Sequence, residues 1–292
     1  MYLPPPENSP SIFPSLSRRQ FLALIGVSVW SVAALPARCQ AGSAFDTDAL
    51  DIHDVPVAVP RLPRHLEGLT IAHLTDTHLR RLGRLEERVL AAVRAREPAV
   101  VVLTGDMIDS RKALPILAEF CGALTAPGRH VLAIRGNHEV RSKVPVADLR
   151  RLYRRAGARL LVNEHVGVDA ALTIVGTEDS LTKHYDLRTA LRGLPATPVR
   201  IHLSHAPEVI DWPRGPAVSF ALCLAGHTHG GQIRFPLLPP YVPKGAGPRF
   251  VAGWYPHTKM GPAYVSRGIG TTSIPLRLNC PPELPFLRLE RA

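Results

Sequence analysis

Short apolar runs alternate with amphipathic stretches along the chain from residue 66, and this alternation predicts strands followed by helices. Helices, with Arg and Glu on the solvent-facing side, are predicted over residues 82–96, 113–124, 146–157 and 187–192. The run over 99–103 is apolar throughout, which is typical of a strand covered on both faces. Later strands are predicted over residues 160–162, 172–176, 199–203, 219–225, 263–267 and 286–289. The pattern indicates a mixed α/β fold in which helices flank a core of two sheets.

Five apolar runs lead into polar loops that carry side chains of the types that can bind metals. The runs cover residues 69–74, 99–103, 130–134, 199–203 and 218–225. The loops read Asp76-Thr77-His78, Gly105-Asp106-Met107-Ile108-Asp109, Gly136-Asn137-His138-Glu139, Ser204-His205 and Gly226-His227-Thr228-His229-Gly230-Gly231-Gln232. Glycines around the last two imidazoles permit turns that a Cβ would forbid, so both rings can point into one pocket. Strands that deliver carboxylates and imidazoles at one end predict a polynuclear metal site at the edge of a sheet.

The order of these motifs, D-x-H, GDxxD, GNHE, a single His and GHTH, resembles that of the calcineurin-like metallophosphoesterase family. The resemblance extends over roughly residues 66–292. It implies a two-sheet αββα sandwich with the metal site at the C-terminal edge of the strands. It also implies a hydrolase that uses two divalent metal ions to cleave a phosphoric ester or anhydride with water.

The family pattern, carried over residue by residue, implies two sets of metal ligands. One ion would be held by Asp76, His78, Asp106 and His229, and the other by Asp106, Asn137, His205 and His227. Asp106 would therefore bridge the two ions and take part in catalysis through that bridge. Four imidazoles, two carboxylates and one amide suit Mn, Fe or Zn, with Mn expected first. The same set disfavours Mg, which prefers oxygen ligands, and Cu(I), which prefers thiolates.

Three residues are predicted to act beside the metal ions. His138 is the candidate for stabilising or protonating the leaving group. Glu139 could hydrogen-bond that imidazole, and Asp109 could orient a ligand. For both carboxylates a loop cap or a solvated charge is an equal alternative. His73 and His202 lie within predicted strands and are expected to be buried histidines rather than ligands.

The apolar, proline-stiffened segment 232–241 follows the GHTH loop and is where substrate choice is expected. GHTHGGQIRFP, SRGIGTT and the terminal PPEL resemble the membrane-associated branch of the family, which includes phosphodiesterases similar to UDP-2,3-diacylglucosamine pyrophosphatases. This resemblance implies a phosphodiester or pyrophosphate substrate linked to a membrane lipid, and hence a membrane surface as partner. Arg234 or Arg267 would bind the anion. The alternative is that segment 232–241 packs against the second sheet.

The first 44 residues are predicted to be a leader rather than part of the fold. Ser17-Arg18-Arg19-Gln20-Phe21-Leu22 resembles a twin-arginine signal, and the uncharged stretch after it is shorter than the roughly 20 residues of a membrane span. Export to the periplasm or another extracytoplasmic site is expected, with a retained signal anchor as the alternative. Residues 45–65 are predicted as an extended segment with a strand around 55–59, followed by the catalytic domain over 66–292.

The leader and the lipid-linked substrate point to different compartments. A uridine nucleotide is expected in the cytoplasm, whereas a twin-arginine route would carry the enzyme across the membrane. Either the leader anchors a cytoplasm-facing enzyme, or the exported enzyme is a broader phosphodiesterase that acts on soluble substrates. The sequence leaves both open, as it does the oligomeric state.

The charge of +11 over 292 residues is carried almost entirely by arginine. Arginine favours phosphate-bearing partners, although a compositional bias explains the charge equally well. A nuclease on the same scaffold is less expected, because the chain has no stripe of basic and aromatic residues, and no nucleic-acid partner is predicted. A non-catalytic binding relative is disfavoured because the whole ligand set is present. The four cysteines have no spacing that predicts a zinc–thiolate site.

Overall fold

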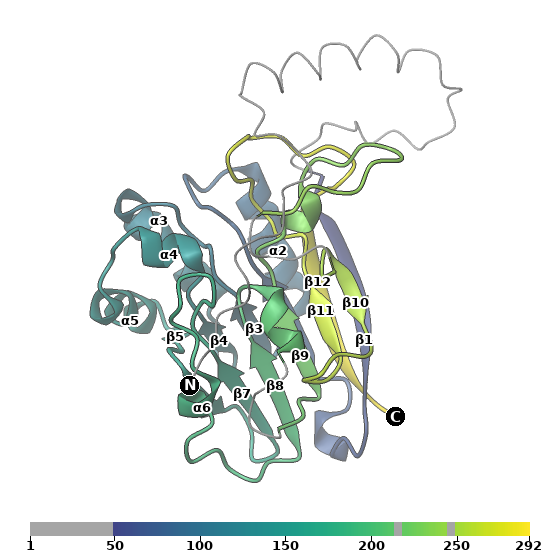
Figure 1. Ribbon diagram of the computed structural model, residues 1–292. Coiled ribbons are helices and arrows are strands. Elements are labelled where there is room, and N and C mark those ends of the chain that lie inside the picture. The colour runs from purple at the N-terminus through teal and green to yellow at the C-terminus, as the bar shows by residue number, and fades with distance from the viewer. Residues whose placement is uncertain (1–48, 213–217, 244–248) are drawn as a thin grey trace. The chain divides into compact units, whose positions relative to one another are not determined.

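The computed structural model describes residues 49–212, 218–243 and 249–292 (Figure 1). The predicted leader, including its twin-arginine motif, lies outside the described residues. No helix within these three ranges is long and apolar enough to cross a membrane.

The first sheet has six strands and carries three of the polar loops at its C-terminal edge. In spatial order its strands are β1 (Asp51–Val59), β12 (Glu283–Arg291), β2 (Thr70–Leu74), β3 (Val100–Leu103), β4 (His130–Ala133) and β5 (Arg159–Leu160). All neighbouring pairs are parallel except β12 with β2. Leu74 pairs with Leu103 and Leu103 with Ala133, so the three central strands end side by side.

The second sheet also has six strands. Their order is β10 (Gly253–Tyr255), β11 (Ala263–Val265), β9 (Leu222–Ala225), β8 (Val199–Leu203), β7 (Leu172–Gly176) and β6 (Glu164–Gly167). The four inner strands are parallel and the two edge strands run antiparallel to their neighbours. Leu203 pairs with Leu224, so β8 and β9 end at one level, directly before the loops that carry His205 and His227.

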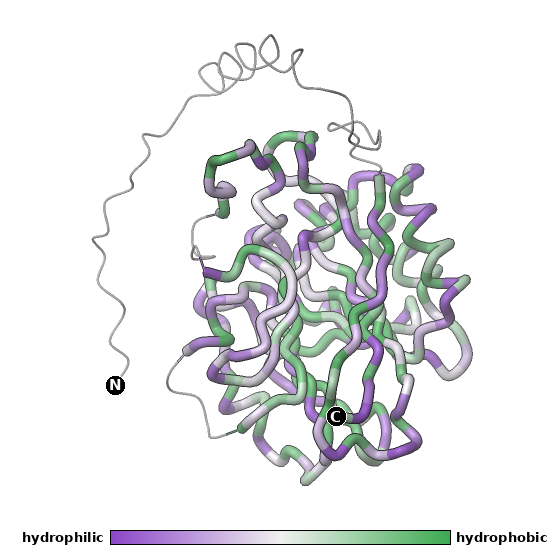
Figure 2. Tube along the Cα trace, turned by 90° about the vertical axis from the view of Figure 1, so that its right-hand side faces the viewer, coloured by the Kyte–Doolittle hydropathy of each residue, from purple (hydrophilic) through white to green (hydrophobic). Residues whose placement is uncertain are grey.

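Helices cover the outer face of each sheet, and apolar side chains fill the space between the sheets. The first sheet packs its outer face on helices α2 (Arg84–Arg96), α3 (Leu114–Leu124) and α5 (Val146–Arg155). The second packs on α6 (Leu187–Ala190) and the 3-10 helix η4 (Pro207–Asp211). Ile71 and Val102 of one sheet meet Ile174 and Leu203 of the other in a single buried cluster. Apolar segments accordingly run through the interior in Figure 2, which confirms the predicted two-sheet αββα fold.

Several elements differ from the sequence-based expectation. The strand expected around 55–59 begins at Asp51 and forms the edge of the first sheet, with Val57 and Val59 buried. The last strand begins at Glu283 rather than at residue 286, because this carboxylate is buried against Arg267 and so breaks the apolar pattern without leaving the core. Strands β6 and β10 and the short helix α4 (Asn137–Arg141) were not predicted. Each is too short to show a clear period in the sequence.

Candidate metal centre

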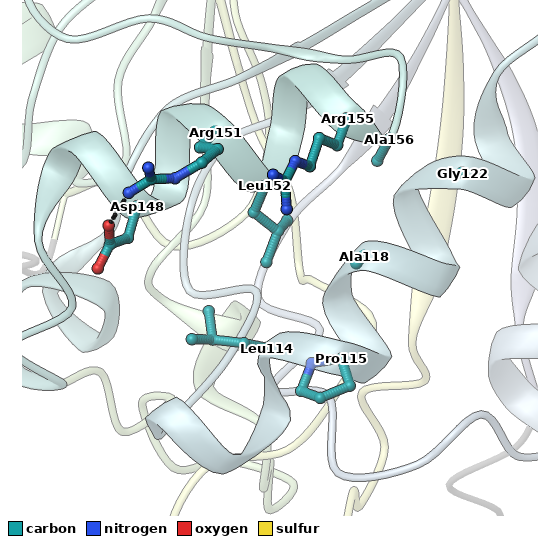
Figure 3. A pocket seen from close by; sticks show the side chains of 9 residues that line it. All are labelled: Leu114, Pro115, Ala118, Gly122, Asp148, Arg151, Leu152, Arg155 and Ala156. Atoms are coloured by element: carbon teal, nitrogen blue, oxygen red, sulfur yellow. Dashed lines mark hydrogen bonds and ion pairs between the residues drawn. The ribbon is translucent and has the colours of Figure 1, made fainter.

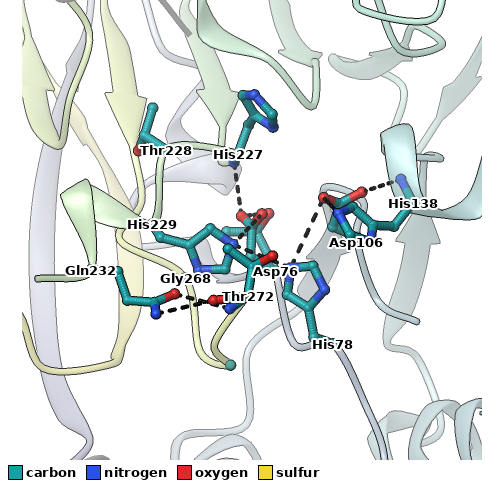
Figure 4. A network of polar contacts seen from close by, with 12 residues as sticks. Asp76, His78, Asp106, His138, His227, Thr228, His229, Gln232, Gly268 and Thr272 are labelled. Carbon is teal, nitrogen blue, oxygen red and sulfur yellow. Dashed lines mark hydrogen bonds and ion pairs between the residues drawn. The ribbon is translucent and has the colours of Figure 1, made fainter. Parts of the chain in front are cut away.

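The polar loops from both sheets meet at one edge and bring six predicted ligands together in two groups. Asp76, His78 and His229 form one group (Figure 4), and Asp106, His205 and His227 form the other. Within each group the candidate ligand atoms all lie within 4.8 Å of one another. Two atoms that are each 2.0–2.2 Å from one ion can be at most about 4.4 Å apart, so these spacings are close to those of bound ligands.

The first group converges on the imidazole nitrogens of His78 and His229. Their Nε2 atoms are 3.1 Å apart, and Asp76 Oδ1 lies 3.5 Å from the Nε2 atom of His229. The other oxygen of Asp76 accepts hydrogen bonds from the Thr75 hydroxyl at 2.7 Å and from the His227 backbone N–H at 2.8 Å. These two bonds fix the carboxylate so that Oδ1 faces the imidazoles.

The second group converges on His205. Its Nε2 atom lies 3.2 Å from Asp106 Oδ2, 3.2 Å from Asn137 Oδ1 and 3.2 Å from the Nδ1 atom of His227. Asp106 also reaches toward the first group, since its Oδ2 atom is 4.0 Å from the Nε2 atom of His78. Asp106 thus lies between the two groups, in the position that a bridging carboxylate requires.

The backbone at these ligands is unusual. Asp76, His78, Asp106, His227 and His229 all have positive φ, between 44° and 69°. A side chain in this region costs conformational energy and tends to be found at functional sites, where the surrounding structure imposes it. The left-handed turns let two residues separated by one position, such as His227 and His229, face different groups.

Close approach between the loops explains two of the glycines. A Cβ on Gly226 would lie 2.3 Å from Asp76 Oδ2, and a Cβ on Gly136 would lie 2.2 Å from Asp106 Oδ1. Any larger residue at either position would displace the predicted ligand beside it. The glycines of the GNHE and GHTH motifs are therefore spacers that allow ligands from different strands to meet.

Asp109 joins the first group to His138. Its Oδ1 atom lies 2.6 Å from the Nδ1 atom of His78 and 2.8 Å from the Nδ1 atom of His138. The two rings meet edge to face at 4.8 Å, and the side chain of His138 remains 27% exposed. Asp109 therefore contacts a predicted ligand and the predicted proton donor with one oxygen, and its role in orienting them stays a prediction.

Of the two roles considered for Glu139, hydrogen-bonding His138 or capping a loop, the structure shows the loop cap. Its buried carboxylate accepts four backbone N–H groups, those of Gly136, Asp106, Met107 and Ile108, at 2.6–3.0 Å. The carboxylate that contacts the ring of His138 is thus Asp109, and the prediction that Glu139 sets that tautomer is corrected. Glu139 instead ties the loop that carries Asp106 to the start of α4.

The charged groups of the site shift one another's pKa values. Burial disfavours a charged Asp106, but the imidazoles of His205 and His78 outweigh burial and hold its pKa well below the ordinary value. Burial alone would lower the pKa of His205. The charge and hydrogen bond of Asp106 raise it by more, so the pKa of His205 lies above its ordinary value. Burial lowers the pKa of His229 well below its ordinary value. A cation that replaced the proton between His205 and Asp106 would satisfy the same two groups.

The donor set fits divalent cations. Nδ1 of His78 lies 2.6 Å from the Asp109 carboxylate, and Nδ1 of His205 lies 2.9 Å from the Thr104 carbonyl. A neutral ring that donates from Nδ1 directs its Nε2 lone pair into the ligand group. Among the described residues, Asp76 Oδ1 and His229 Nδ1 are buried without a hydrogen-bond partner. Nitrogen and carboxylate ligands without sulfur suit the borderline ions Mn, Fe and Zn.

The two arginines predicted to bind substrate lie in different surroundings. Arg234 is half-buried and donates from Nε to the Gly230 carbonyl at 2.6 Å, next to the first group. Arg267 pairs with Asp51 at 2.5 Å and Glu283 at 2.9 Å. To bind a substrate anion, Arg267 would have to leave these two carboxylates.

Two residues that the sequence did not single out organise the loops around the site. Arg277 is 1% exposed and donates to the carbonyls of Gly270 and Gly268, and burial lowers its pKa to about 10. Gln232 donates to the carbonyls of Thr272, Ile274 and Leu276 at 2.8–3.2 Å. Both lie in loops without a regular period, so the sequence offered no signal for these contacts with distant backbone carbonyls.

A cavity between two helices is separate from the metal groups. It has a volume of about 500 Å³, lies between α3 and α5, and contains none of the predicted site residues (Figure 3). Its lining consists of Leu114, Pro115, Ala118, Gly122, Asp148, Arg151, Leu152, Arg155 and Ala156. Arg151 pairs with Asp148 at 2.6 Å across one turn of α5, so this cavity presents a solvated helix surface rather than a reactive group.

Comparison with known proteins agrees with the motifs. Residues 69–231 match the family model described as calcineurin-like phosphoesterase. The Bacillus subtilis protein YkoQ, described as an uncharacterized metallophosphoesterase, is 30% identical over 227 residues, which cover 75% of this chain and 82% of YkoQ. YkuE of the same organism, with the same description, is 28% identical over 94% of this chain and 98% of its own. A zebrafish transmembrane protein with a metallophosphoesterase domain is 28% identical over 94% of this chain and 63% of its own.

Proposed function

Because the chain belongs to the calcineurin-like phosphoesterase family of phosphoric ester hydrolases, we propose that it hydrolyses a phosphodiester or pyrophosphate bond with two divalent cations. The observation that carries this proposal is the meeting of two ligand groups with Asp106 between them. We further propose that the substrate is linked to a membrane lipid, similar to UDP-2,3-diacylglucosamine.

The predicted ligands would hold one ion at Asp76, His78, Asp106 and His229 and one at Asp106, Asn137, His205 and His227. When bound, such ions polarise phosphoryl oxygens and lower the pKa of a water molecule. Mn is the ion that we expect first, with Fe and Zn as alternatives. The protein's own part is to fix the ligands, and Asp109 and the carbonyl of Thr104 do so by holding Nδ1 of His78 and His205.

His138 is placed to give a proton to the leaving group. Its Nδ1 atom lies 2.8 Å from Asp109, which leaves Nε2 as the atom that can give a proton to the departing oxygen. The ring is part-exposed beside the buried ligands, so a substrate can reach it. Asp109 keeps the proton on Nδ1 and fixes the ring plane, as a carboxylate does for an imidazole acid.

The lipid-linked substrate is supported by an exposed apolar segment beside the first group. Leu237 is fully exposed, and Leu238 and Tyr241 are 63% and 76% exposed. The segment returns to the site, because a Cβ on Gly231 would lie 2.6 Å from the Cβ of Pro240. Exposed leucine and tyrosine side chains next to a phosphate-binding site suit a substrate whose other part is an acyl chain or a membrane surface.

The second candidate is an exported phosphodiesterase that acts on soluble substrates. The motif around Arg18 and Arg19 favours it, since a twin-arginine leader would move the enzyme away from cytoplasmic nucleotides. Replacing both arginines by lysine should leave the protein in the cytoplasm if the leader is of this type. Export that continues at the wild-type rate would remove this support and leave a retained anchor as the alternative.

The experiment that tests the function compares two substrates with the Mn-loaded protein that lacks its leader. These are a diacylated sugar nucleotide in vesicles and bis(4-nitrophenyl) phosphate in solution. Hydrolysis of both, with preference for the lipid, would support the full proposal, and turnover of the soluble ester alone would favour the second candidate. Replacing Leu237, Leu238 and Tyr241 by serine should lower the rate on vesicles and spare the soluble ester. No hydrolysis of either substrate would refute the proposed function.

A further inference from the structure

A cavity lined by arginines opens directly beside the first ligand group. Its volume is about 230 Å³. Three arginines contribute to its wall, Arg80, Arg81 and Arg84, all with exposed side chains. The rest of the lining consists of Thr77, His78, Gly83, Leu85, Glu86, Ile269, Gly270, Thr271 and Pro275. Since His78 is a predicted ligand, this cavity adjoins the metal centre, unlike the larger one between α3 and α5.

The cavity carries an excess of positive charge. Its one carboxylate, Glu86, is already engaged, because its Oε2 atom accepts the backbone N–H of Gly83 at 2.8 Å. With Arg80 offset by Asp109, the charges of Arg81 and Arg84 still exceed that of Glu86, so the cavity attracts anions. Guanidinium groups present paired N–H donors that match two oxygens of a phosphate, so they recognise this group better than a point charge does.

Arg80 connects the cavity to the reactive part of the site. Its Nη2 atom lies 3.5 Å from Asp109 Oδ2, and the other oxygen of Asp109 holds His78 and His138. Asp109 therefore links Arg80 to the predicted ligand His78 and to the proposed proton donor His138. Within the part of the chain that the structure describes, Arg81 and Arg84 form no ion pair with the metal centre, and their guanidinium groups can face a ligand in the cavity.

The opposite wall is held rigidly. Gly270 donates to the Asp76 carbonyl at 2.8 Å, and Arg277 donates to the Gly270 carbonyl at 2.6 Å. Gln232 binds the carbonyls of the following residues, including Thr272 and Ile274. The cavity thus has one fixed wall and one wall of long cationic side chains, an arrangement that can close around an anion without moving the backbone.

We propose that this cavity binds a second phosphate group of the substrate, in addition to the phosphoryl group that is hydrolysed. The inference rests on the proposed function and deepens it, because it narrows the substrate to esters or anhydrides that carry a further phosphate. Arg81 and Arg84 are the specificity-determining residues. Arg80 assists them while it also pairs with Asp109.

The test uses a matched pair of chromogenic diesters, thymidine 5′-(4-nitrophenyl phosphate) with and without a 3′-phosphate. The readout is the ratio of kcat/KM for the two esters, measured with the Mn-loaded chain. In Arg81→Gln/Arg84→Gln we expect this preference for the second phosphate to fall at least tenfold. Arg80 is left in place, because its replacement would also disturb Asp109.

The control variant removes two positive charges at a distance from the cavity. Arg64→Gln/Arg94→Gln also changes two exposed arginines, one before β2 and one in the last turn of α2, at the opposite ends of these elements from the cavity. This variant should keep the wild-type preference. A preference that is unchanged in the cavity variant, or that falls equally in both variants, would overturn the proposal, since the second result would show general attraction of anions.

A binding measurement separates this proposal from the proposed function. Calorimetry on the same proteins compares thymidine 3′,5′-bisphosphate with thymidine 5′-monophosphate. Tighter binding of the bisphosphate that is lost only in Arg81→Gln/Arg84→Gln supports the cavity even if neither ester is hydrolysed. Equal binding of the two nucleotides by the wild-type chain would refute the cavity, even if both esters are hydrolysed.

Discussion

The Nε2 atoms of His78 and His229 face each other at 3.1 Å in the interior of the protein. Nδ1 of His78 lies 2.6 Å from Asp109, so a neutral His78 directs its lone pair at the other ring. Two imidazole nitrogens at this distance are stable only with a proton or a cation between them. The surrounding carboxylates Asp76 and Asp106 favour positive charge at this point, and a divalent ion supplies more of it than one proton.

The first prediction concerns metal content. Asp106→Asn should lose most of both ions, because the bridging carboxylate belongs to both groups, whereas His229→Ala should lose about one of two. Mass spectrometry of metals bound after dialysis measures this. His257→Ala, which changes an exposed histidine outside the site, should retain the full content. An Asp106→Asn protein that keeps two ions and full activity would refute the two-ion arrangement.

The second prediction concerns His138. His138→Ala should retain both ions but lose roughly 10²–10⁴ in kcat, the usual contribution of a general acid. The loss should grow as the leaving group becomes more basic, because a poor leaving group depends most on protonation. A series of aryl phosphodiesters measures this dependence.

Asp109→Asn offers a companion variant for His138. The amide can still contact the ring but carries no charge to stabilise an imidazolium, so we expect a smaller loss of rate with the same dependence on the leaving group. Because Asp109 also holds Nδ1 of His78, the rates are compared at full metal content. A fall in metal content in His138→Ala would instead mean that His138 is itself a ligand. An equal loss for all leaving groups would exclude the role of proton donor.

The third prediction concerns the link between the two loops. Glu139→Gln should lower the free energy of unfolding by about 3 kcal/mol, since the charged acceptor of several backbone N–H groups is lost and an amide N–H is brought toward them. Urea unfolding in a chelator measures the change without a contribution from metals. Glu86→Gln removes a carboxylate that accepts one backbone N–H at the start of α2 and should cost about 1 kcal/mol or less. Equal costs for the two variants would contradict the role given to Glu139.

The strand pattern was sufficient to predict where the ligands meet, but not how the loops between them are built. Parallel strands of one sheet end at one edge, so Asp76 had to lie near Asp106, and His205 near His227, whatever the detail of the loops. The role of Glu139 depends on α4, a helix of five residues that leaves no periodic signal. Local patterns thus specify elements, while contacts between loops require the tertiary structure.

The arginine-lined cavity also depends on tertiary contacts that the sequence pattern does not predict. Arg81 and Arg84 follow closely after the D-x-H motif in the sequence. The cavity that they line, however, is completed by Gly270 and Thr271, which are far away in the sequence. Conversely, Arg267 looked suitable for binding an anion, but the fold brings Asp51 and Glu283 against it. The net charge of the surroundings, which decides what an arginine can bind, is a property of the fold.

The last prediction concerns acid stability and two histidines that are not ligands. His73 and His202 are fully buried, and each has one hydrogen bond to a threonine hydroxyl, at 2.8 and 3.0 Å. Burial lowers the pKa of both to about 3, from 6.5. Between these values the unfolded chain binds protons that the native chain does not, so stability must fall as the pH drops below 6.5, by about 1.4 kcal/mol per pH unit for each histidine.

Urea unfolding of the metal-free protein at pH 7, 6 and 5 measures this slope. In His73→Gln/His202→Gln we expect lower stability at pH 7 but a slope that is shallower below pH 6, by up to about 2.7 kcal/mol per pH unit. If the double variant kept the wild-type slope, other groups would have to be responsible for the acid sensitivity.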